Sequence, residues 1–150
     1  MNVLLVDPEI ETIEKVVEDL NLLIPDFKCS ITHSANGCMN ILNNNNIDIV
    51  ILDMCSIDSH ALNLIREIYD EFDVPVIVLS KDKNINSLVN TLSVGASDYI
   101  IRPFNERIFA ARLKATVRRK EWDIQSLDNK EVDTNKRKNA QYTLQGGDVY

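Results

Sequence analysis

The sequence predicts a doubly wound α/β domain built around a five-stranded parallel sheet. Short aliphatic runs alternate along the chain with amphipathic stretches, which is typical of repeated strand and helix units. The aliphatic runs are apolar on consecutive residues, as expected for strands that are covered on both faces. The chain has 150 residues, of which 45% are apolar, and this suits one domain with a substantial core. We therefore expect parallel strands joined by right-handed crossovers.

The first strand and helix occupy the start of the chain. The strand is the run Val3–Val6, and it leads to Asp7 and then to Pro8, a residue suited to the first turn of a helix. The helix is predicted to end before Pro25. Its apolar residues form one stripe, which contains Ile10, Ile13, Val16, Val17 and Leu20.

The second and third units repeat this arrangement, with strands at Cys29–Thr32 and Ile47–Leu52. Ser34 is a suitable cap for the second helix, because its hydroxyl can accept a hydrogen bond from a free backbone N–H. The apolar residues of the second helix are Cys38, Ile41 and Leu42, and those of the third are Leu62, Ile65 and Ile68.

The fourth and fifth units have strands at Val76–Leu79 and Tyr99–Ile101. Gly95 is predicted to end the fourth helix in the left-handed conformation, and Asn105 is predicted to cap the fifth. Apolar residues recur at helical spacing in the fourth helix at Ile85, Leu88, Val89 and Leu92. In the fifth helix the inward residues are Phe109, Leu113 and Val117.

Composition argues against several classes of protein. The net charge of −7 argues against a chain that mainly binds nucleic acid, because phosphate neutralisation needs clustered cations. The three cysteines form no CxxC pair, which argues against disulfide or zinc frameworks and fits a reducing cytoplasm. We expect neither a cleaved leader nor a membrane span, which needs roughly 20 apolar residues. His33 and His60 are far apart in the sequence, so we expect surface histidines.

Polar residues stand at the ends of four predicted strands: Asp7, Asp53, Ser80 and Arg102. The carboxyl ends of parallel strands form the ligand-binding edge of a doubly wound sheet. Any one of these residues alone is best explained as an ordinary strand end or helix cap. Four of them at one edge favour a functional site.

Four segments resemble the receiver domain of bacterial two-component response regulators. They are VLLVDPE, DIVILDM, VPVIVLSKD and GASDYIIRPF, and their order and spacing match that family over residues 1–120. The segment RIFAARLKATVRRK in the fifth helix resembles the OmpR/PhoB subfamily of winged-helix transcription regulators. The resemblance implies a flavodoxin-like sheet with strand order 2-1-3-4-5.

The resemblance also implies a role for each residue at the ligand-binding edge. Asp53 corresponds to the aspartate that accepts a phosphoryl group from a histidine kinase, and Ser80 to the switch hydroxyl that turns toward the phosphoryl oxygens. Tyr99 corresponds to the aromatic rotamer switch. Asp7 corresponds to an acidic-pocket residue that would bind Mg²⁺ together with Asp53 and the main-chain carbonyl of Cys55.

The acidic pocket departs from the family pattern. Members normally have two consecutive acidic residues after the first strand, but Pro8 follows Asp7 and offers no side-chain oxygen. Glu9 is one position late, and one helical step turns a side chain by about 100°, so we expect it to be a poor substitute ligand. Arg102 stands where the family has lysine, and a guanidinium pairs well with carboxylates. We therefore expect weak Mg²⁺ binding and an apo site in which Arg102 neutralises the carboxylates.

Residues 121–150 contain few large apolar side chains and are predicted to form a linker. The last segment, YTLQGGDVY, resembles the first strand of the winged-helix domain that follows receivers of the OmpR/PhoB subfamily. The resemblance therefore implies that the chain is the receiver part of a longer protein. DNA would be bound only by a downstream domain.

The resemblance further implies a dimer interface made of the fourth helix, the fifth strand and the fifth helix. Three charged residues match partners in ion pairs between subunits of the subfamily: Asp98, Arg112 and Arg119. Leu88 and Ile108 replace another such pair. Because burial of apolar side chains does not depend on phosphorylation, we predict a two-fold dimer that forms with Asp53 unmodified.

Two functions remain open from the sequence. The first is a phosphorelay receiver with Asp53 as acceptor, which regulates an attached DNA-binding domain through dimerisation. The alternative is a pseudo-receiver that works without phosphorylation and serves only in dimerisation or partner docking. A flavodoxin-like enzyme has no support, because no glycine-rich or hydroxyl-rich phosphate loop follows the first strand, and we expect no enzyme activity.

Overall fold

The computed structural model describes residues 1–55 and 57–128, in which strands and helices alternate. The strands are β1 (Asn2–Val6), β2 (Lys28–Thr32), β3 (Ile49–Met54), β4 (Val76–Ser80) and β5 (Asp98–Ile101). The helices are α1 (Ile10–Leu23), α2 (Ala35–Asn44), α3 (Ser59–Glu71), α4 (Ile85–Ser93) and α5 (Glu106–Asp128).

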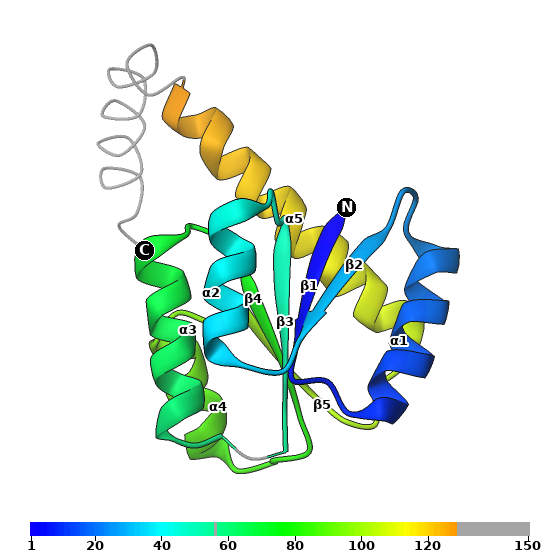
Figure 1. Cartoon of the computed structure of the whole chain (residues 1–150), viewed down its shortest axis with the longest axis vertical. Coiled ribbons are helices and arrows are strands. Elements are labelled where there is room, and N and C mark those ends of the chain that lie inside the picture. Colours follow the sequence, from blue (N-terminus) through cyan, green and yellow to red (C-terminus); the bar gives the residue numbers. More distant parts are fainter. Residues whose placement is uncertain (56, 129–150) are drawn as a thin grey trace, which may run out of the picture. The chain divides into compact units, whose positions relative to one another are not determined.

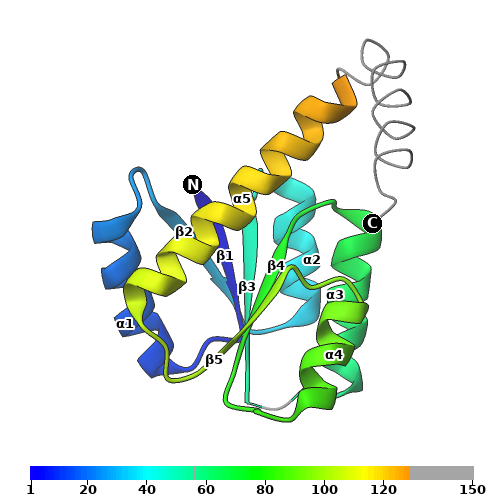
Figure 2. The ribbon, with the colours of Figure 1, turned by 180° about the vertical axis from the view of Figure 1, so that it is seen from behind.

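The five strands form one parallel sheet in the order β2-β1-β3-β4-β5, which confirms the predicted architecture. Helices α1 and the first part of α5 cover one face of the sheet, and α2, α3 and α4 cover the other (Figure 1 and Figure 2). The chain runs outward from β1 to β2 and then returns to β3. The carboxyl ends of β1 and β3 therefore lie side by side at the switch in strand order.

Alternate strand residues contribute to two apolar layers. In β1, Leu4 and Val6 join the layer that contains α2 and α3, whereas Val3 and Leu5 join the layer that contains α1 and α5. Strands β3 and β4 alternate in the same way and are almost entirely buried. Since both faces need apolar side chains, these strands are continuous aliphatic runs in the sequence.

Some predicted boundaries differ from the structure. Strand β3 ends at Met54 and was predicted to end at Leu52, so Asp53 lies inside the strand and not after it. Helix α1 has Glu9 as its N-cap residue, so Pro8 precedes the helix and is not in its first turn. Ile10, which was expected on the apolar stripe, is 75% exposed. The buried stripe of α1 contains Thr12, Val16 and Leu20.

The predicted helix ends are confirmed by their contacts. The Ser34 hydroxyl accepts a hydrogen bond from the backbone N–H of Gly37 at 2.9 Å, and Asn105 accepts hydrogen bonds from two backbone N–H groups of α5. Gly95 follows α4 with φ of +126°, and a Cβ atom there would lie 2.7 Å from the Tyr69 side chain. Glycine is therefore required at this position for both conformation and space.

Helix α4 exposes most of its apolar residues. Ile85, Val89 and Leu92 are 70%, 53% and 42% exposed, while Leu88 is half-buried against the core and Thr91 is fully buried. The helical spacing was predicted correctly. Spacing alone does not show which side of a helix faces the sheet.

Residues 1–117 form one compact unit, which contains the whole sheet, and residues 118–150 form a second unit. Helix α5 continues through Asp128, so residues 121–128 are helical where the sequence predicted a linker. In this part the Arg118 guanidinium lies 5.4 Å from the ring centroid of Trp122. The segment YTLQGGDVY lies outside the described residues. Among the described helices, none is both long enough and apolar enough to cross a membrane.

Candidate functional site

Asp53 lies near the carboxyl end of β3, the central strand of the sheet. It is aligned with Leu79 of β4, and the next residue, Met54, is aligned with Ser80. The Asp53 side chain is fully buried. A buried carboxylate is costly without a compensating partner, so the groups around Asp53 determine what it can do.

Arg102 provides the compensating cation. Its backbone N–H donates to the carbonyl of Ser80 at 2.9 Å, which fixes the base of the side chain beside β4. The guanidinium contacts Asp53 through Nη2 and Oδ1, while Nη1 donates to Glu9 Oε2 and Thr12 Oγ1, each at 3.1 Å. The Arg102 side chain is only 10% exposed, so solvent screens this pair weakly. This is the neutralised arrangement that the sequence led us to expect.

Glu9 enters the same network, so the extended backbone brings it to the site, while its predicted weakness as a Mg²⁺ ligand stays a prediction. Its backbone N–H donates to Asp53 Oδ2 at 3.1 Å, and its carboxylate accepts from the Cys55 thiol at 2.8 Å. The Cys55 hydrogen bond and the nearby Arg102 charge lower the pKa of Glu9. The expectation assumed a helical step of about 100° per residue. Glu9 instead precedes α1 with extended backbone, φ −68° and ψ 153°, so that step does not apply.

Asp7 points to a different neighbour. Its φ of +52° lies in the left-handed region, and its backbone N–H donates to the carbonyl of Thr32 at 2.7 Å. The side chain is 63% exposed and lies 3.8 Å from Nδ1 of His33. Asp7, His33 and His60 line one cavity of about 140 Å³, so the fold brings the two histidines together although the sequence separates them.

The described residues do not fit a Mg²⁺ site in this arrangement. Magnesium needs several oxygen ligands with nearly octahedral geometry. Asp53 is instead paired with Arg102, and Asp7 is turned toward His33. No group of three or more His, Cys, Asp or Glu residues in the described part of the chain is arranged to hold a metal. Cys55 is exposed, and its hydrogen bond to Glu9 raises the pKa of the thiol.

Ser80 and Tyr99 are both connected to Asp82, in the loop between β4 and α4. The buried Ser80 hydroxyl accepts a hydrogen bond from the backbone N–H of Asp82 at 3.1 Å. The Tyr99 hydroxyl donates to the Asp82 carbonyl at 2.7 Å, and burial raises the pKa of Tyr99. The Asp82 carboxylate accepts from the Ser87 hydroxyl in α4 at 2.6 Å. The two residues that were predicted as switches are thus hydrogen-bonded to one loop, which is tied to α4.

The sequence model of a protein family, the response regulator receiver domain, matches residues 3–114 of this chain. The chain belongs to this family. Receiver domains typically bind Mg²⁺ at an acidic pocket, interact with histidine kinases and dimerise. Asp53, Arg102 and Glu9 all lie within the matched range.

The curated relatives of this receiver are transcription regulators of the OmpR/PhoB type. The regulatory protein VirG of Rhizobium radiobacter is 28% identical over 130 residues, which cover 86% of this chain and 48% of VirG. The transcriptional regulatory protein CpxR of Escherichia coli K12 is 28% identical over 127 residues, which cover 85% of this chain and 53% of CpxR. The chain thus spans about half the length of these relatives.

A solved structure of an atypical orphan response regulator is also similar to this receiver. It is 25% identical, with a TM-score of 0.67, and the match covers 79% of this chain and 96% of that one. That structure is described as revealing a phosphorylation-independent regulatory mechanism.

The predicted dimer residues lie on α4, β5 and α5. Ile108 is 57% exposed, whereas Leu88 is half-buried. Asp98 Oδ2 lies 3.9 Å from Arg112 Nη1 within the same chain. Arg119 is exposed on the part of α5 that belongs to the second unit. Within residues 1–117, five large apolar residues are exposed on these three elements, and we call them the apolar patch: Ile85, Val89, Leu92, Ile101 and Ile108.

Proposed function

We propose that this receiver accepts a phosphoryl group on Asp53 from a histidine kinase in the cytoplasm and thereby controls an attached DNA-binding domain. The similarity to VirG and CpxR supports this reading, because CpxR is named a transcriptional regulatory protein. The match covers about half of each relative. On this proposal the chain is a signalling switch and has no substrate turnover of its own.

The observation that carries this proposal is the position of the Asp53 carboxylate beside Arg102 at the carboxyl end of β3. Phosphoryl transfer is helped mainly by positioning and by positive charge near the phosphoryl oxygens. An oxygen of Asp53 would form the new O–P bond while the bond between phosphorus and the donor breaks. The freed guanidinium would then pair with phosphoryl oxygens. Ser80, which is aligned with Met54 next to Asp53, would contribute its hydroxyl.

Arg102 also restrains Asp53 before the transfer. The nucleophilic carboxylate is buried and paired, so it must leave the guanidinium before it can attack. The Arg102 guanidinium competes with Mg²⁺ for the Asp53 carboxylate, which supports the prediction that metal binding is weak. We therefore expect phosphorylation to be slow compared with receivers that have a lysine and the full acidic pair.

Intact-mass measurement after incubation with acetyl phosphate and Mg²⁺ tests this proposal. The phosphoryl group moves from acetyl phosphate to Asp53, and acetate leaves. We expect a slow gain of one phosphoryl mass that is absent in the Asp53→Asn variant. The gain of mass in both proteins, or in neither over many hours, would contradict Asp53 as the acceptor.

A second candidate function is a phosphorylation-independent dimerisation module, and the apolar patch favours it. Its five members expose aliphatic side chains to solvent on α4, β5 and α5. Exposed aliphatic side chains that gather on one part of a surface are typical of sites that bind another protein, and α4, β5 and α5 are consecutive elements of the chain. The similar orphan regulator has a mechanism without phosphorylation, which supports this alternative. If Asp53 stays unmodified in the mass experiment and the protein is dimeric, this second function is the better account.

The dimer is proposed to be two-fold, because a self-complementary patch buries the same residues on both copies. Ile108 would be part of the contact, together with the charged residues Asp98 and Arg112. Arg119 belongs to the second unit and stays a predicted member of the interface. Leu88 is half-buried against the core of its own chain, so we expect it to offer a partner less apolar surface than Ile108 does.

A further inference from the structure

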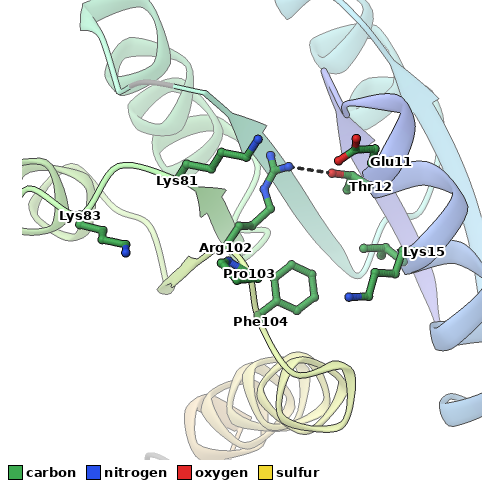
Figure 3. Close-up of a pocket in the computed structure, with 9 residues that line it drawn as sticks. Glu11, Thr12, Lys15, Lys81, Lys83, Arg102, Pro103 and Phe104 are labelled. Atoms are coloured by element: carbon green, nitrogen blue, oxygen red, sulfur yellow. Dashed lines mark hydrogen bonds between the residues drawn. The ribbon is translucent and has the colours of Figure 1, made fainter.

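A cavity of about 440 Å³ lies between α1 and the segments that follow β4 and β5 (Figure 3). Arg102 and Lys81 line it, and both also contact residues of the Asp53 site. Pockets that bind small organic molecules have volumes of about 300–1,000 Å³. A phosphoryl group on Asp53 would need only a small part of such a volume, so the proposed function leaves this cavity unexplained.

One wall of the cavity is apolar. Val16 contributes from α1, and Pro103 and Phe104 contribute from the segment after β5. The Phe104 ring faces the side of α1 that carries Lys15 (Figure 3). It packs against Phe109 with ring centroids 4.9 Å apart, which fixes its position. A fixed aromatic surface favours a flat apolar ligand.

The rim of the cavity is cationic. Its four basic residues are Lys15, Lys81, Lys83 and Arg102, and Glu11 is the one acidic residue among the lining residues that the structure describes. This excess of basic residues stands out in a chain with a net charge of −7. A concave surface lined by one sign of charge attracts ligands of the opposite sign.

The lysines keep hydrogen-bond donors for a ligand. Lys15 pairs with Glu106 at 2.8 Å and Lys81 lies 3.8 Å from Glu9, but neither acid lines the cavity. An ammonium group has three donors, so each of these lysines retains donors beyond its pair. Lys83 forms no salt bridge with any residue in the described ranges.

We propose that this cavity binds a small organic anion, with a flat apolar body against Phe104 and a phosphate or carboxylate group at Lys81 and Lys83. This inference goes beyond the proposed function and holds whether or not Asp53 is phosphorylated. Arg102 lies in the cavity wall and also on Asp53. The negative charge of a bound anion near this wall would weaken the attraction between the guanidinium and Asp53, which links the ligand to the proposed phosphoacceptor.

Calorimetric titration of the whole chain with naphthyl phosphate tests the proposal. Naphthoate, inorganic phosphate and naphthol are the comparison ligands, and they separate the phosphate group, the carboxylate group and the ring. We expect naphthyl phosphate or naphthoate to bind at least about tenfold more tightly than inorganic phosphate or naphthol. Backbone NMR shifts should map to α1 and to the segments after β4 and β5. Shifts that map elsewhere, or equal affinity for the fragments, would overturn the proposal.

Three substitutions test the charge of the rim. Lys83→Glu makes the rim less positive and should weaken binding of the anion by about tenfold or more. Glu11→Gln makes the rim more positive and should strengthen binding. Lys28→Glu is the matched control, since Lys28 begins β2 at the amino end of the sheet. It makes the same change in net charge away from the cavity. Equal effects of Lys83→Glu and Lys28→Glu would show that only net charge matters and would overturn the site.

Discussion

The guanidinium of Arg102 and the carboxylate of Asp53 form a buried ion pair that joins the end of β5 to the central strand β3. Breaking one side of such a pair leaves an uncompensated charge in the protein interior. On the proposed function, the same contact would hold the Asp53 carboxylate away from a phosphoryl donor and from a metal ion. Arg102 would then affect both the stability of this receiver and its phosphorylation.

Replacing Arg102 alone should be strongly destabilising. We expect Arg102→Met to lower the free energy of unfolding by about 3–5 kcal/mol, because the buried Asp53 carboxylate loses its cationic partner. The double variant with Asp53→Asn should lose clearly less than the sum of the single variants. Urea denaturation of the native chain, the two single variants and the double variant gives these free energies of unfolding.

Lys15→Met is the control for this cycle, because it removes an exposed ion pair with Glu106 on the surface. We expect it to cost no more than about 1 kcal/mol. If the effects of Arg102→Met and Asp53→Asn simply add, the two residues do not stabilise one another.

Arg102→Lys should accelerate phosphorylation of Asp53. A lysine ammonium is a compact charge that holds a carboxylate less rigidly than the planar guanidinium. The rate at which acetyl phosphate adds a phosphoryl mass should therefore rise, with folding checked by circular dichroism. A rate equal to that of the native chain would show that Arg102 does not restrain the acceptor.

Pro8→Asp should strengthen Mg²⁺ binding. This substitution restores the second of two consecutive acidic residues after β1, and hard cations bind more tightly as carboxylate ligands are added. Titration calorimetry with MgCl₂ should show at least about tenfold tighter binding than for the native chain. Pro25→Asp, at the exposed end of α1, is the matched control. Tight Mg²⁺ binding by the native chain would refute the idea that Pro8 impairs the site.

Glu9 should make stability depend on pH in the acidic range. The Cys55 thiol and Arg102 hold the pKa of Glu9 below its ordinary value of 4.5. A lowered pKa in the folded state stabilises the fold above pH 4.5, and this contribution is lost as the pH falls through the folded value. The native chain should thus be more stable than Glu9→Gln near pH 7, and the difference should shrink below pH 4.5.

Thermal unfolding of the native chain and of Glu9→Gln across this pH range measures the difference. Glu14→Gln serves as control, since Glu14 is exposed on the same helix. A difference between native and Glu9→Gln proteins that stays constant with pH would argue against the assigned contacts.

Ile108→Glu should dissociate the proposed dimer and leave the fold intact. Ile108 is 57% exposed, so a charge there is tolerated in the monomer, whereas it is costly inside an apolar contact. Full burial of an isoleucine contributes about 1.5–3 kcal/mol, so dimerisation should weaken at least about tenfold. Sedimentation at several concentrations should show this with Asp53 unmodified.

Ile10→Glu is the matched control for the dimer, because Ile10 is 75% exposed on α1 and lies outside the apolar patch. It should leave the association unchanged. A native chain that remains monomeric at high concentration would exclude this interface.

The sequence alone determined the fold, because strand and helix formation depends on short-range periodicity. Consecutive apolar residues in β1, β3 and β4 predicted strands covered on both faces, and the 3.6-residue spacing predicted the helices. It also identified Asp53, Ser80 and Arg102 as neighbours, since parallel strands bring their carboxyl ends to one edge.

Tertiary structure decided which acidic residue joins Asp53. The left-handed backbone of Asp7 turns its side chain to His33, and the extended backbone of Glu9 brings the later residue into the Arg102 network. Neither dihedral angle can be inferred from the order of the residues. The sequence also could not show which face of α4 is exposed. The spacing of apolar residues defines a stripe along the helix but does not show whether that stripe faces the sheet. Only packing of the helices on the sheet selects the side that is buried, and only that packing brings α1 and the segments after β4 and β5 together around a cavity.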